Sequence, residues 1–460
     1  WRLSIISELV HHFPPQFPGF AGVMLKNYHF YYDFLVATTY QLTGISIIQL
    51  YFFCFSSLSA FLFVLGVYAL LEKFTKQKIF STYGTILTVL TGNISYILPY
   101  FSDAYNFFAR SNIFMSDQPF DQGHNPFNLF SYALVLSGIF LFMKWQETKK
   151  FQWILLNCVL FSVAPGVKIY AAIALVLLYG TGVFFETLLS KSFDWKVMLP
   201  LIALVPSLKF ISGSGFSILS FNPGWLLVKM IEDHDRLFLS NMTLRESYYR
   251  ETGNYLRLSF LKIEQLLMYI FGNLNVRILG FGALFFIFKD TQKRLIFLLL
   301  GFGGIGIALI PLLFSQKRGV YDSIQFTPYA LIAYGLLTVL VLHSFFKKFH
   351  TSIYMRGGFL AVLMALAIPT NAWVFLNYTR NTGDMIKKEE LDGLAALNEK
   401  SNSDDVILTD LSMQKMEWLY VPALSARRAF LSGISLIEQS GVTTSARKKE
   451  VEDFFFYDKL

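Results

Sequence analysis

Long apolar runs separated by short polar segments make up most of this chain. Each run approaches the roughly 20 residues that a helix needs to cross a hydrocarbon core of about 30 Å. A helix is expected because a backbone in lipid must satisfy its own hydrogen bonds. The pattern predicts an all-α polytopic membrane protein with about ten transmembrane helices. We place them at 47–71, 80–100, 128–145, 151–166, 168–186, 197–213, 266–288, 294–314, 325–345 and 354–377.

The polar segments between these runs are of two kinds, and the two kinds alternate. One kind is short and basic, and cytoplasmic loops of membrane proteins carry an excess of Lys and Arg. We assign to the cytoplasm the segments 73–78, 144–150, 191–196, 289–294 and 347–356. The remaining segments and the C-terminal tail are then extracytoplasmic, and the protein is expected to be a multi-pass protein of the plasma membrane. These outer loops are 1–46, 101–127, 214–265 and 315–324.

The stretch 151–186 leaves the number of crossings open. Pro165, Gly166 and Lys168 lie between two short apolar runs. Two spans joined by a tight outward turn keep the alternation of basic loops regular, whereas one broken helix would invert the upstream topology. The regular alternation favours two spans.

The C-terminal residues differ in composition and predict a small extracytoplasmic α/β region. Residues 385–399 have helical periodicity, 406–408 predict a short strand, and 448–456 predict another helix. The expected domains are the first outer loop (1–46), the helical bundle with its outer loops (47–377) and this region (378–460). Because the chain begins at Trp1 instead of Met, we expect the natural N-terminus to lie upstream.

Composition agrees with a membrane protein and excludes other classes. Of the 460 residues, 54% are hydrophobic and only 15% are charged, whereas a soluble domain carries about 25% charged residues. The net charge of +8 comes from the short basic clusters, so it reflects topology and predicts no nucleic-acid partner. Cys54 and Cys158 lie in apolar runs, where a structural disulfide is not expected.

The first outer loop carries three candidates for catalysis. His29 and Asp33 are four residues apart, so a helix would place them on one face. A His–carboxylate pair there can orient a base or hold a metal. Glu8 is the earliest acid in the chain. A purely structural role is the alternative for these residues. His29 could be an interfacial anchor in an aromatic segment, and Glu8 could lie on a solvated helix face.

The second outer loop adds acids and a histidine. Asp103 is a further candidate for catalysis, and Asp117, Asp121 and His124 form a set that can bind a sugar or a divalent cation. Their spacing is not that of a strong metal site. A divalent metal stays an open option, no metal ligand is assigned, and a plain hydrophilic loop is the alternative.

Three cations lie where positive charge is unexpected. Lys168 is at the outer membrane face, and Lys317 and Arg318 are in the outer loop 315–324, although outer loops are poor in Lys and Arg. An anion such as a lipid phosphate or pyrophosphate would account for them. Snorkelling to headgroups is the alternative.

Several segments resemble bacterial integral-membrane glycosyltransferases of the GT-C superfamily, which includes protein O-mannosyltransferases, oligosaccharyltransferases and aminoarabinose transferases. The likeness is distributed along nearly the whole chain, without one diagnostic motif. It is carried by FPPQFPGFAGVMLKNYHFYYDFL (13–35), QGHNPFN (122–128), KIYAAIALVLLYG (168–180), SIQFTPYALIAYG (323–335), DDVILTD (404–410) and VPALSARRAFLSG (421–433).

The resemblance implies a polyprenyl-phosphate-linked sugar donor and inversion at the anomeric carbon. A first-loop carboxylate would act as base or orient the acceptor, sometimes with a divalent metal, and outer basic residues would hold the lipid phosphate. The family's key acid lies early in that loop, at a position that would precede Trp1 here. The chemistry also suits the chain on physical grounds, because such a donor needs a helical bundle, a cationic phosphate site and an outward carboxylate.

The sequence therefore predicts a glycosyltransferase of the cell envelope for hexosyl or pentosyl transfer, with the sugar and the acceptor (protein, lipid or polysaccharide) open. The alternatives are a transporter or flippase of lipid-linked sugars and a non-catalytic membrane scaffold. Few charges lie within the spans, which argues against transport because transporters place ionisable sites near the midplane. The predicted catalytic residues are Glu8, His29, Asp33 and Asp103, and the predicted substrate-binding residues are Lys168, Lys317, Arg318, Asp121 and His124.

Overall fold

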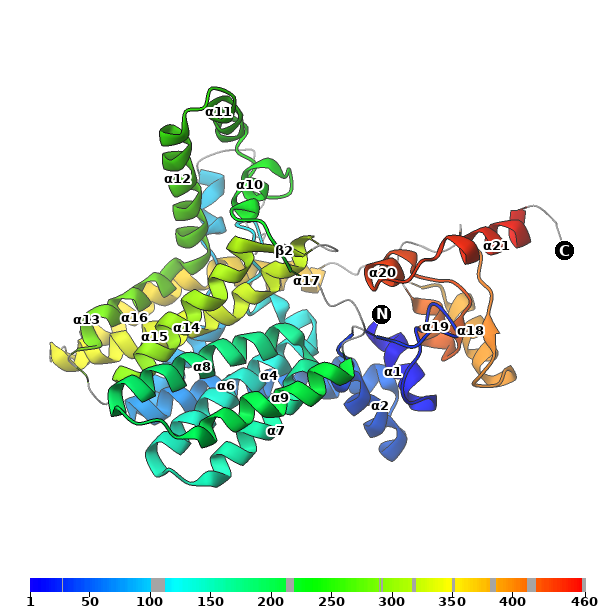
Figure 1. The fold of residues 1–460 in the computed structure, drawn as a ribbon, viewed down its shortest axis with the longest axis horizontal. Helices are drawn as coiled ribbons and strands as arrows, with labels where there is room; N and C mark the ends of the chain where they lie inside the picture. The colour runs from blue at the N-terminus through cyan, green and yellow to red at the C-terminus, as the bar shows by residue number, and fades with distance from the viewer. Residues whose placement is uncertain are drawn as a thin grey trace.

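The helices of this chain form a long bundle, with a smaller lobe beyond one end of it (Figure 1). We call this smaller part the end lobe; it consists of residues 1–43 and 386–456. The computed structural model describes residues 1–26, 28–100, 112–211, 219–288, 290, 293–316, 320–349, 352–380, 386–411 and 419–456. The bundle contains α4 (Phe55–Thr75), α5 (Lys78–Leu90), α6 (Pro126–Thr148), α7 (Phe151–Val167), α8 (Ile169–Ser190), α9 (Leu199–Ile211), α14 (Arg294–Leu313), α15 (Thr327–Lys348), α16 (Ile353–Ala367) and α17 (Pro369–Arg380).

Membrane-spanning helices are present, but fewer than predicted. Within the described residues six helices are long and apolar enough to cross a membrane, or seven if α16 and α17, bent by 48°, make one span. This supports a multi-pass membrane protein. The prediction of about ten spans is not confirmed, because α5, α7 and α9 have 13, 17 and 13 residues. The six are Ile47–Thr75, Pro126–Thr148, Ile169–Ser190, Tyr255–Phe286, Arg294–Leu313 and Tyr321–Lys348.

The stretch 151–186 folds as two helices, α7 and α8, that lie side by side. The ring centroids of Phe161 and Tyr179 are 5.1 Å apart, although an unbroken helix would separate these positions by about 27 Å. The chain therefore doubles back at Lys168, as the alternation of basic segments favoured.

Small residues let the bundle helices approach closely. A Cβ on Gly84 of α5 would lie 2.4 Å from Val339 of α15, and one on Gly335 of α15 would lie 2.8 Å from Thr88 of α5. Such close approach through small residues is how helices pack in lipid, where burial of apolar surface supplies little driving force. α15 thus lies at the centre of the bundle.

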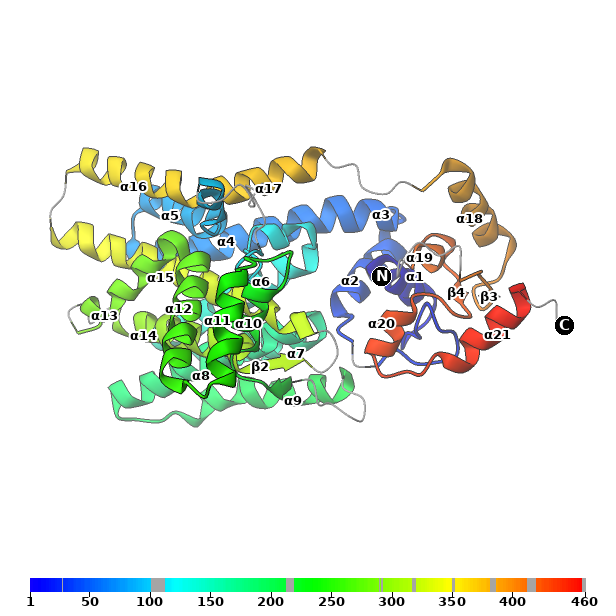
Figure 2. The same ribbon diagram turned by 90° about the horizontal axis from the view of Figure 1, so that it is seen from above.

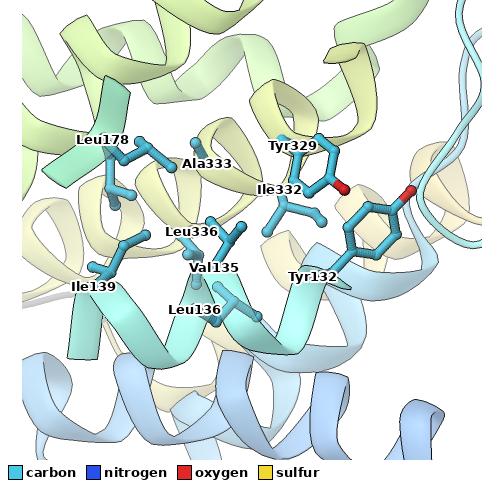
Figure 3. A pocket seen from close by; sticks show the side chains of 10 residues that line it. Tyr132, Val135, Leu136, Ile139, Leu178, Tyr329, Ile332, Ala333 and Leu336 are labelled. Carbon is cyan, nitrogen blue, oxygen red and sulfur yellow. The ribbon is translucent and has the colours of Figure 1, made fainter. Parts of the chain in front are cut away.

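A small apolar void lies between α6, α8, α14 and α15. Val135, Leu136 and Leu336 line it, and Tyr132 and Tyr329 lie at one end (Figure 3). The two tyrosine rings pack edge to face at 4.9 Å, and the Tyr329 hydroxyl is 2.7 Å from Ser131 Oγ. The tyrosines separate the apolar interior from the polar residues at the lobe end of the bundle.

Three helices project from the side of the bundle: α10 (Trp225–Glu232), α11 (Ser240–Glu251) and α12 (Tyr255–Leu274). In Figure 1 α12 runs across the direction of the long helices. The predicted span 266–288 overlaps the candidate span Tyr255–Phe286. It comprises the second half of α12, the 3₁₀ segment η5 (Asn275–Gly282) and α13 (Ala283–Phe286), with Asn275 at φ 50° where the direction changes. Strand β1 (Leu219–Phe221) pairs antiparallel with β2 (Phe314–Gln316) and ties this projection to the bundle.

The end lobe combines the two ends of the described chain. Its helices α1 (Arg2–His11) and α2 (Tyr31–Thr43) share one apolar core with the C-terminal residues, including Ile5, Leu431 and Ile437. The predicted helices 385–399 and 448–456 and the predicted strand 406–408 are confirmed by α18, α21 and β3. The C-terminal elements are α18 (Lys388–Lys400), β3 (Val406–Ile407), α19 (Tyr420–Ser425), β4 (Arg428–Ala429), α20 (Ile434–Gln439) and α21 (Ser445–Phe456).

Backbone contacts join the first outer loop to the C-terminal residues. The Ala429 N–H donates to the Pro18 carbonyl at 2.7 Å, and the Ser432 N–H donates to the Gly19 carbonyl at 2.8 Å. A Cβ on Gly19 would lie 2.2 Å from the Ser432 oxygen, so only glycine permits this approach. The described parts of 1–43 and 386–456, which were predicted to lie in separate domains (1–46 and 378–460), therefore pack against each other.

Candidate functional site

A buried polar cluster, which we call the junction layer, lies where the bundle meets the end lobe. Its centre is Lys168 in the turn between α7 and α8, with 1% of its surface exposed. The Lys168 ammonium donates to Asn128 Oδ1 and lies 5.1 Å from the centre of the Phe127 ring. Asn128 Nδ2 in turn donates to Gln122 Oε1 at 2.5 Å. The turn is thus anchored to the first residues of α6.

A second buried cation approaches the same aromatic ring. The Arg2 guanidinium carbon lies 3.9 Å from the centre of the Phe127 ring, and Arg2 Nη1 is 2.5 Å from Asp33 Oδ2. Asp33 is fully buried. Burial raises the pKa of its carboxyl to about 6, and the charge of Arg2 opposes this rise. The junction layer therefore contains two cations, and Asp33 fixes the position of one of them.

His29 does not form the predicted pair with Asp33. Helix α2 begins at Tyr31, so His29 precedes it and does not share its face. The His29 carbonyl accepts a hydrogen bond from Arg2 at 3.0 Å, while its ring stacks on Tyr28 at 4.8 Å. Burial and the charges of Arg2 and Lys168 hold the pKa of His29 well below its usual value. His29 is therefore a neutral ring in the wall of the junction layer.

Asp117 is the partly exposed carboxylate of this region. Burial and the charge of Asp121 raise its pKa to about 6, against the charges of Arg236, His124 and Lys168. At neutral pH Asp117 is ionised, and it is less deeply buried than Asp33. These are the properties that a general base needs.

Asp322 approaches Lys168 from another element. It lies in the 3₁₀ segment η6 (Val320–Phe326) and is partly buried. Burial and the charge of Arg2 lower the pKa of Lys168 to about 7, whereas the charges of Asp117 and Asp322 raise it. The junction layer thus brings together cations and carboxylates from the end lobe, the α7–α8 turn, the loop before η3, and η6.

Asp121 and His124 lie at the rim, in the short segment η3 (Asp121–His124). His124 Nδ1 is 2.6 Å from the Asp121 carbonyl oxygen, and its Nε2 is 2.7 Å from the side-chain amide of Asn125. The Tyr378 hydroxyl of α17 donates to Asp121 Oδ1 at 3.1 Å. Both ring nitrogens of His124 are thus engaged. In the part of the chain that the structure describes, no three His, Cys, Asp or Glu residues lie close enough to hold a metal ion, so the optional divalent metal has no ligand set there.

Glu8 lies in a different cluster, which we call the latch: Glu8, His12, Asp404 and Arg428. Glu8 Oε2 is 3.4 Å from His12 Nδ1 and 3.8 Å from Arg428 Nε. Arg428 Nη2 and His12 Nε2 approach Asp404 Oδ1 at 2.8 and 2.9 Å. Burial raises the pKa of Glu8. The latch joins α1 to the C-terminal residues of the end lobe, and Glu8 contacts no residue of the junction layer among those described.

Three predicted site residues, Asp103, Lys317 and Arg318, lie outside the described residues. Other residues of the region were missed by the sequence interpretation, chiefly Arg2, Asn128 and Asp322. Of these, only Asp322 carried a signal, because it shares the outer loop 315–324 with the basic pair.

Arg277 is a further missed residue, in a run interpreted as apolar. It is 1% exposed and belongs to the candidate span Tyr255–Phe286. Its Nη1 donates to Gln118 Oε1 at 2.8 Å and its Nη2 to the Thr91 carbonyl at 2.5 Å. Gln118 follows Asp117 directly, so Arg277 fixes the loop that carries the Asp117 carboxylate. The sequence signal for Arg277 is its charge inside a predicted membrane span. A charge there costs free energy, so an intramembrane arginine indicates a structural or functional role.

Comparison with known proteins identifies a shared fold. No family model matches this chain, and no curated protein matches its sequence. The fold is similar to that of the Archaeoglobus fulgidus oligosaccharyltransferase in complex with zinc and sulfate, with a TM-score of 0.50 at 12% identity over 94% of this chain and 58% of that one. The apo form of that protein gives a TM-score of 0.51 at 11% identity, over 94% and 60%. The chain thus spans about three fifths of the neighbour's length.

Proposed function

We propose that this protein is a membrane glycosyltransferase that moves a sugar from a polyprenyl-phosphate-linked donor to an acceptor at the lobe end of the bundle, on the extracytoplasmic side. The observation that carries the proposal is Lys168, buried beside Arg2 and close to Asp117 and Asp322 at the end of an apolar bundle. The fold shared with an oligosaccharyltransferase supports the same reaction class.

The cations of the junction layer are suited to a phosphate. Lys168 and Arg2 are both buried, where their charges act at low dielectric and stabilise an anion more strongly than in water. Negative charge develops on the donor phosphate as its bond to the sugar breaks, and a fixed cation favours that transition state. Lys317 and Arg318, from the neighbouring outer loop, are proposed to bind the same phosphate.

Asp117 is the proposed general base. In the reaction the acceptor oxygen bonds to the anomeric carbon, the bond from that carbon to the phosphate oxygen breaks, and Asp117 receives the acceptor proton. The phosphate leaves on its lipid, with inversion at the sugar. Asp33 is a positioning residue because its carboxylate is occupied by Arg2, and Asp121 and His124 at the rim are placed to contact hydroxyl groups of the sugar or the acceptor.

The test uses the full protein in lipid nanodiscs with radiolabelled polyprenyl-phosphate and polyprenyl-diphosphate sugars. Donor cleavage is measured as released polyprenyl phosphate or polyprenyl diphosphate, according to the donor, with water or membrane extract as acceptor, so the acceptor need not be known. We expect cleavage of at least one donor, and an Asp117→Asn protein is the inactive control. If every donor stays intact while the same lipids cross proteoliposome membranes, the protein is a transporter; if neither occurs, it is a scaffold.

A further inference from the structure

A groove lies at the end of the bundle opposite the junction layer, between α5 and α16. These two helices run side by side (Figure 2), and the groove between them has a volume of about 850 Å³. Cavities of about 300–1,000 Å³ are typical of small-molecule sites. The groove lies far from Lys168, because it opens beside the first residues of α5, whereas the last residues of α5 lead toward the junction layer.

The walls of the groove are apolar along most of their length. Ile79 and Tyr83 of α5 are exposed, and Leu360 and Met364 of α16 face the same space. At Gly357 of α16 an added Cβ would meet no atom within 4 Å, so the backbone there is open. In a membrane such a space is filled by apolar chains, because water finds too few hydrogen-bonding partners there.

The mouth of the groove is cationic. Lys78 is the first residue of α5, and Arg356 lies in the first turn of α16; both line the groove. A cation in the first turn of a helix is unfavourable beside the positive end of the helix dipole, and an anion there is favourable. Gln77 gives α5 no side-chain cap, so its first N–H groups are also available to an anion.

Lys78 differs from other lysines at this end of the bundle. Lys73 pairs with Glu147, Lys149 pairs with Glu186, and both acids belong to neighbouring helices. Within the described ranges Lys78 forms no ion pair, although it stands at the mouth of an apolar groove. The charge complementary to this mouth is that of a phosphate group.

We infer that this groove binds an anionic phospholipid of the adjacent leaflet, with its phosphate between Lys78 and Arg356 and one acyl chain along the walls of α5 and α16. Basic pockets between membrane helices on the cytoplasmic side are suited to anionic headgroups. The site is separate from the proposed transfer site, and lipid bound here joins α16, which is largely exposed, to the rest of the bundle.

The test is native mass spectrometry of the full protein after titration with phosphatidylglycerol and, separately, phosphatidylcholine of the same chains. We expect one phosphatidylglycerol to bind with at least tenfold preference, and a Lys78→Gln/Arg356→Gln double variant to lose that preference. A Lys191→Gln/Lys196→Gln variant removes two exposed charges near the α8–α9 turn, outside the groove, and is expected to keep it.

A second variant tests whether an acyl chain occupies the apolar walls of the groove. Ala361→Trp fills the groove without altering its charges, and it is expected to weaken phosphatidylglycerol binding at least fivefold while donor cleavage is unchanged. Equal binding of both lipids to the unmodified protein would overturn the inference, as would full preference in the double variant or in the Ala361→Trp protein. Displacement of phosphatidylglycerol by polyprenyl phosphate at equal concentration would also overturn it, because it would make the groove a donor-lipid site.

Discussion

Asp33 and Glu8 are buried carboxylates of the first outer loop, and each lies near an arginine. Asp33 is 2.5 Å from Arg2, whose guanidinium also lies against the Phe127 ring in the junction layer. Glu8 is 3.8 Å from Arg428, whose main ionic contact is the exposed Asp404. The first pair joins the end lobe to the bundle, whereas the second joins two parts of the end lobe to each other.

The difference shows that the surroundings of the partner arginine determine what each acid does. Arg2 has one carboxylate partner in a buried layer that also contains Lys168, so any change there alters a set of coupled charges. Arg428 contacts Asp404, Gln16 and Glu8, so the loss of one partner leaves others.

Breaking the two ion pairs should destabilise the protein to different extents. Arg2→Met leaves the Asp33 charge buried and unpaired, which costs about 3–5 kcal/mol. Arg428→Met leaves Glu8 near His12 and the Gln16 N–H, so its cost should be about 1 kcal/mol, as for one hydrogen bond. Thermal unfolding in detergent checks the order, and equal losses in the two variants would remove the contrast.

Lys168→Met should slow donor cleavage without unfolding the protein. Loss of one buried cation aimed at a developing phosphate charge costs on the order of 10²–10³ in rate. The Met side chain is unbranched and apolar like the lysine stem, so it fills the same buried space. Steady-state donor cleavage measures the effect, and a rate within threefold of the unmodified protein would show that the phosphate binds elsewhere.

Gly166→Ala should loosen the end lobe from the bundle. A Cβ on Gly166 of α7 would lie 2.0 Å from the Tyr31 ring of α2, and overpacking of this kind costs about 1–3 kcal/mol. We expect faster proteolysis of residues 1–43 and slower donor cleavage. Gly180→Ala is the matched control, since its Cβ would meet nothing within 4 Å; identical behaviour of the two variants would argue against the α2–α7 contact.

The pH dependence of donor cleavage should be bell-shaped. A base must be ionised, so kcat/KM should rise with pH until about 6, the raised pKa of Asp117. A phosphate-binding lysine must be protonated, so the rate should fall above about 7, the lowered pKa of Lys168. Each limb should change the rate about tenfold per pH unit. The residual cleavage by Asp117→Asn should lack the acidic limb, and a flat profile in the unmodified protein would contradict both assignments.

The sequence predicted the helical membrane class and the two-helix form of 151–186, and it indicated Lys168 as a charge at a span end, because these depend on local hydropathy and charge. It could not separate Asp33 from Glu8. The two acids differ in their arginine partners. Glu8 lies near Arg428, which is far along the chain, and Asp33 pairs with Arg2, which is 31 residues before it.

The predicted number of spans is not confirmed, for a related reason. The run 80–100 is apolar enough for one span, yet α5 ends at Leu90. The Gly92 N–H donates to the Ala367 carbonyl at 2.7 Å, and Arg277 binds the Thr91 carbonyl. The hydrogen bonds from Arg277 and to Ala367 thus satisfy backbone groups that a longer α5 would have paired within the helix. Both partners lie far along the chain, so the hydropathy of the run 80–100 gives no sign of them.

The most direct test compares Asp117→Asn with Glu8→Gln in the donor-cleavage assay, in the full protein and with one donor. Each variant replaces one carboxylate by its amide, so volume and fold are matched. The account predicts a loss on the order of 10²–10⁴-fold for Asp117→Asn and a rate within twofold of the unmodified protein for Glu8→Gln. The reverse result, with Glu8→Gln inactive and Asp117→Asn unaffected, would place the chemistry in the latch and contradict the account.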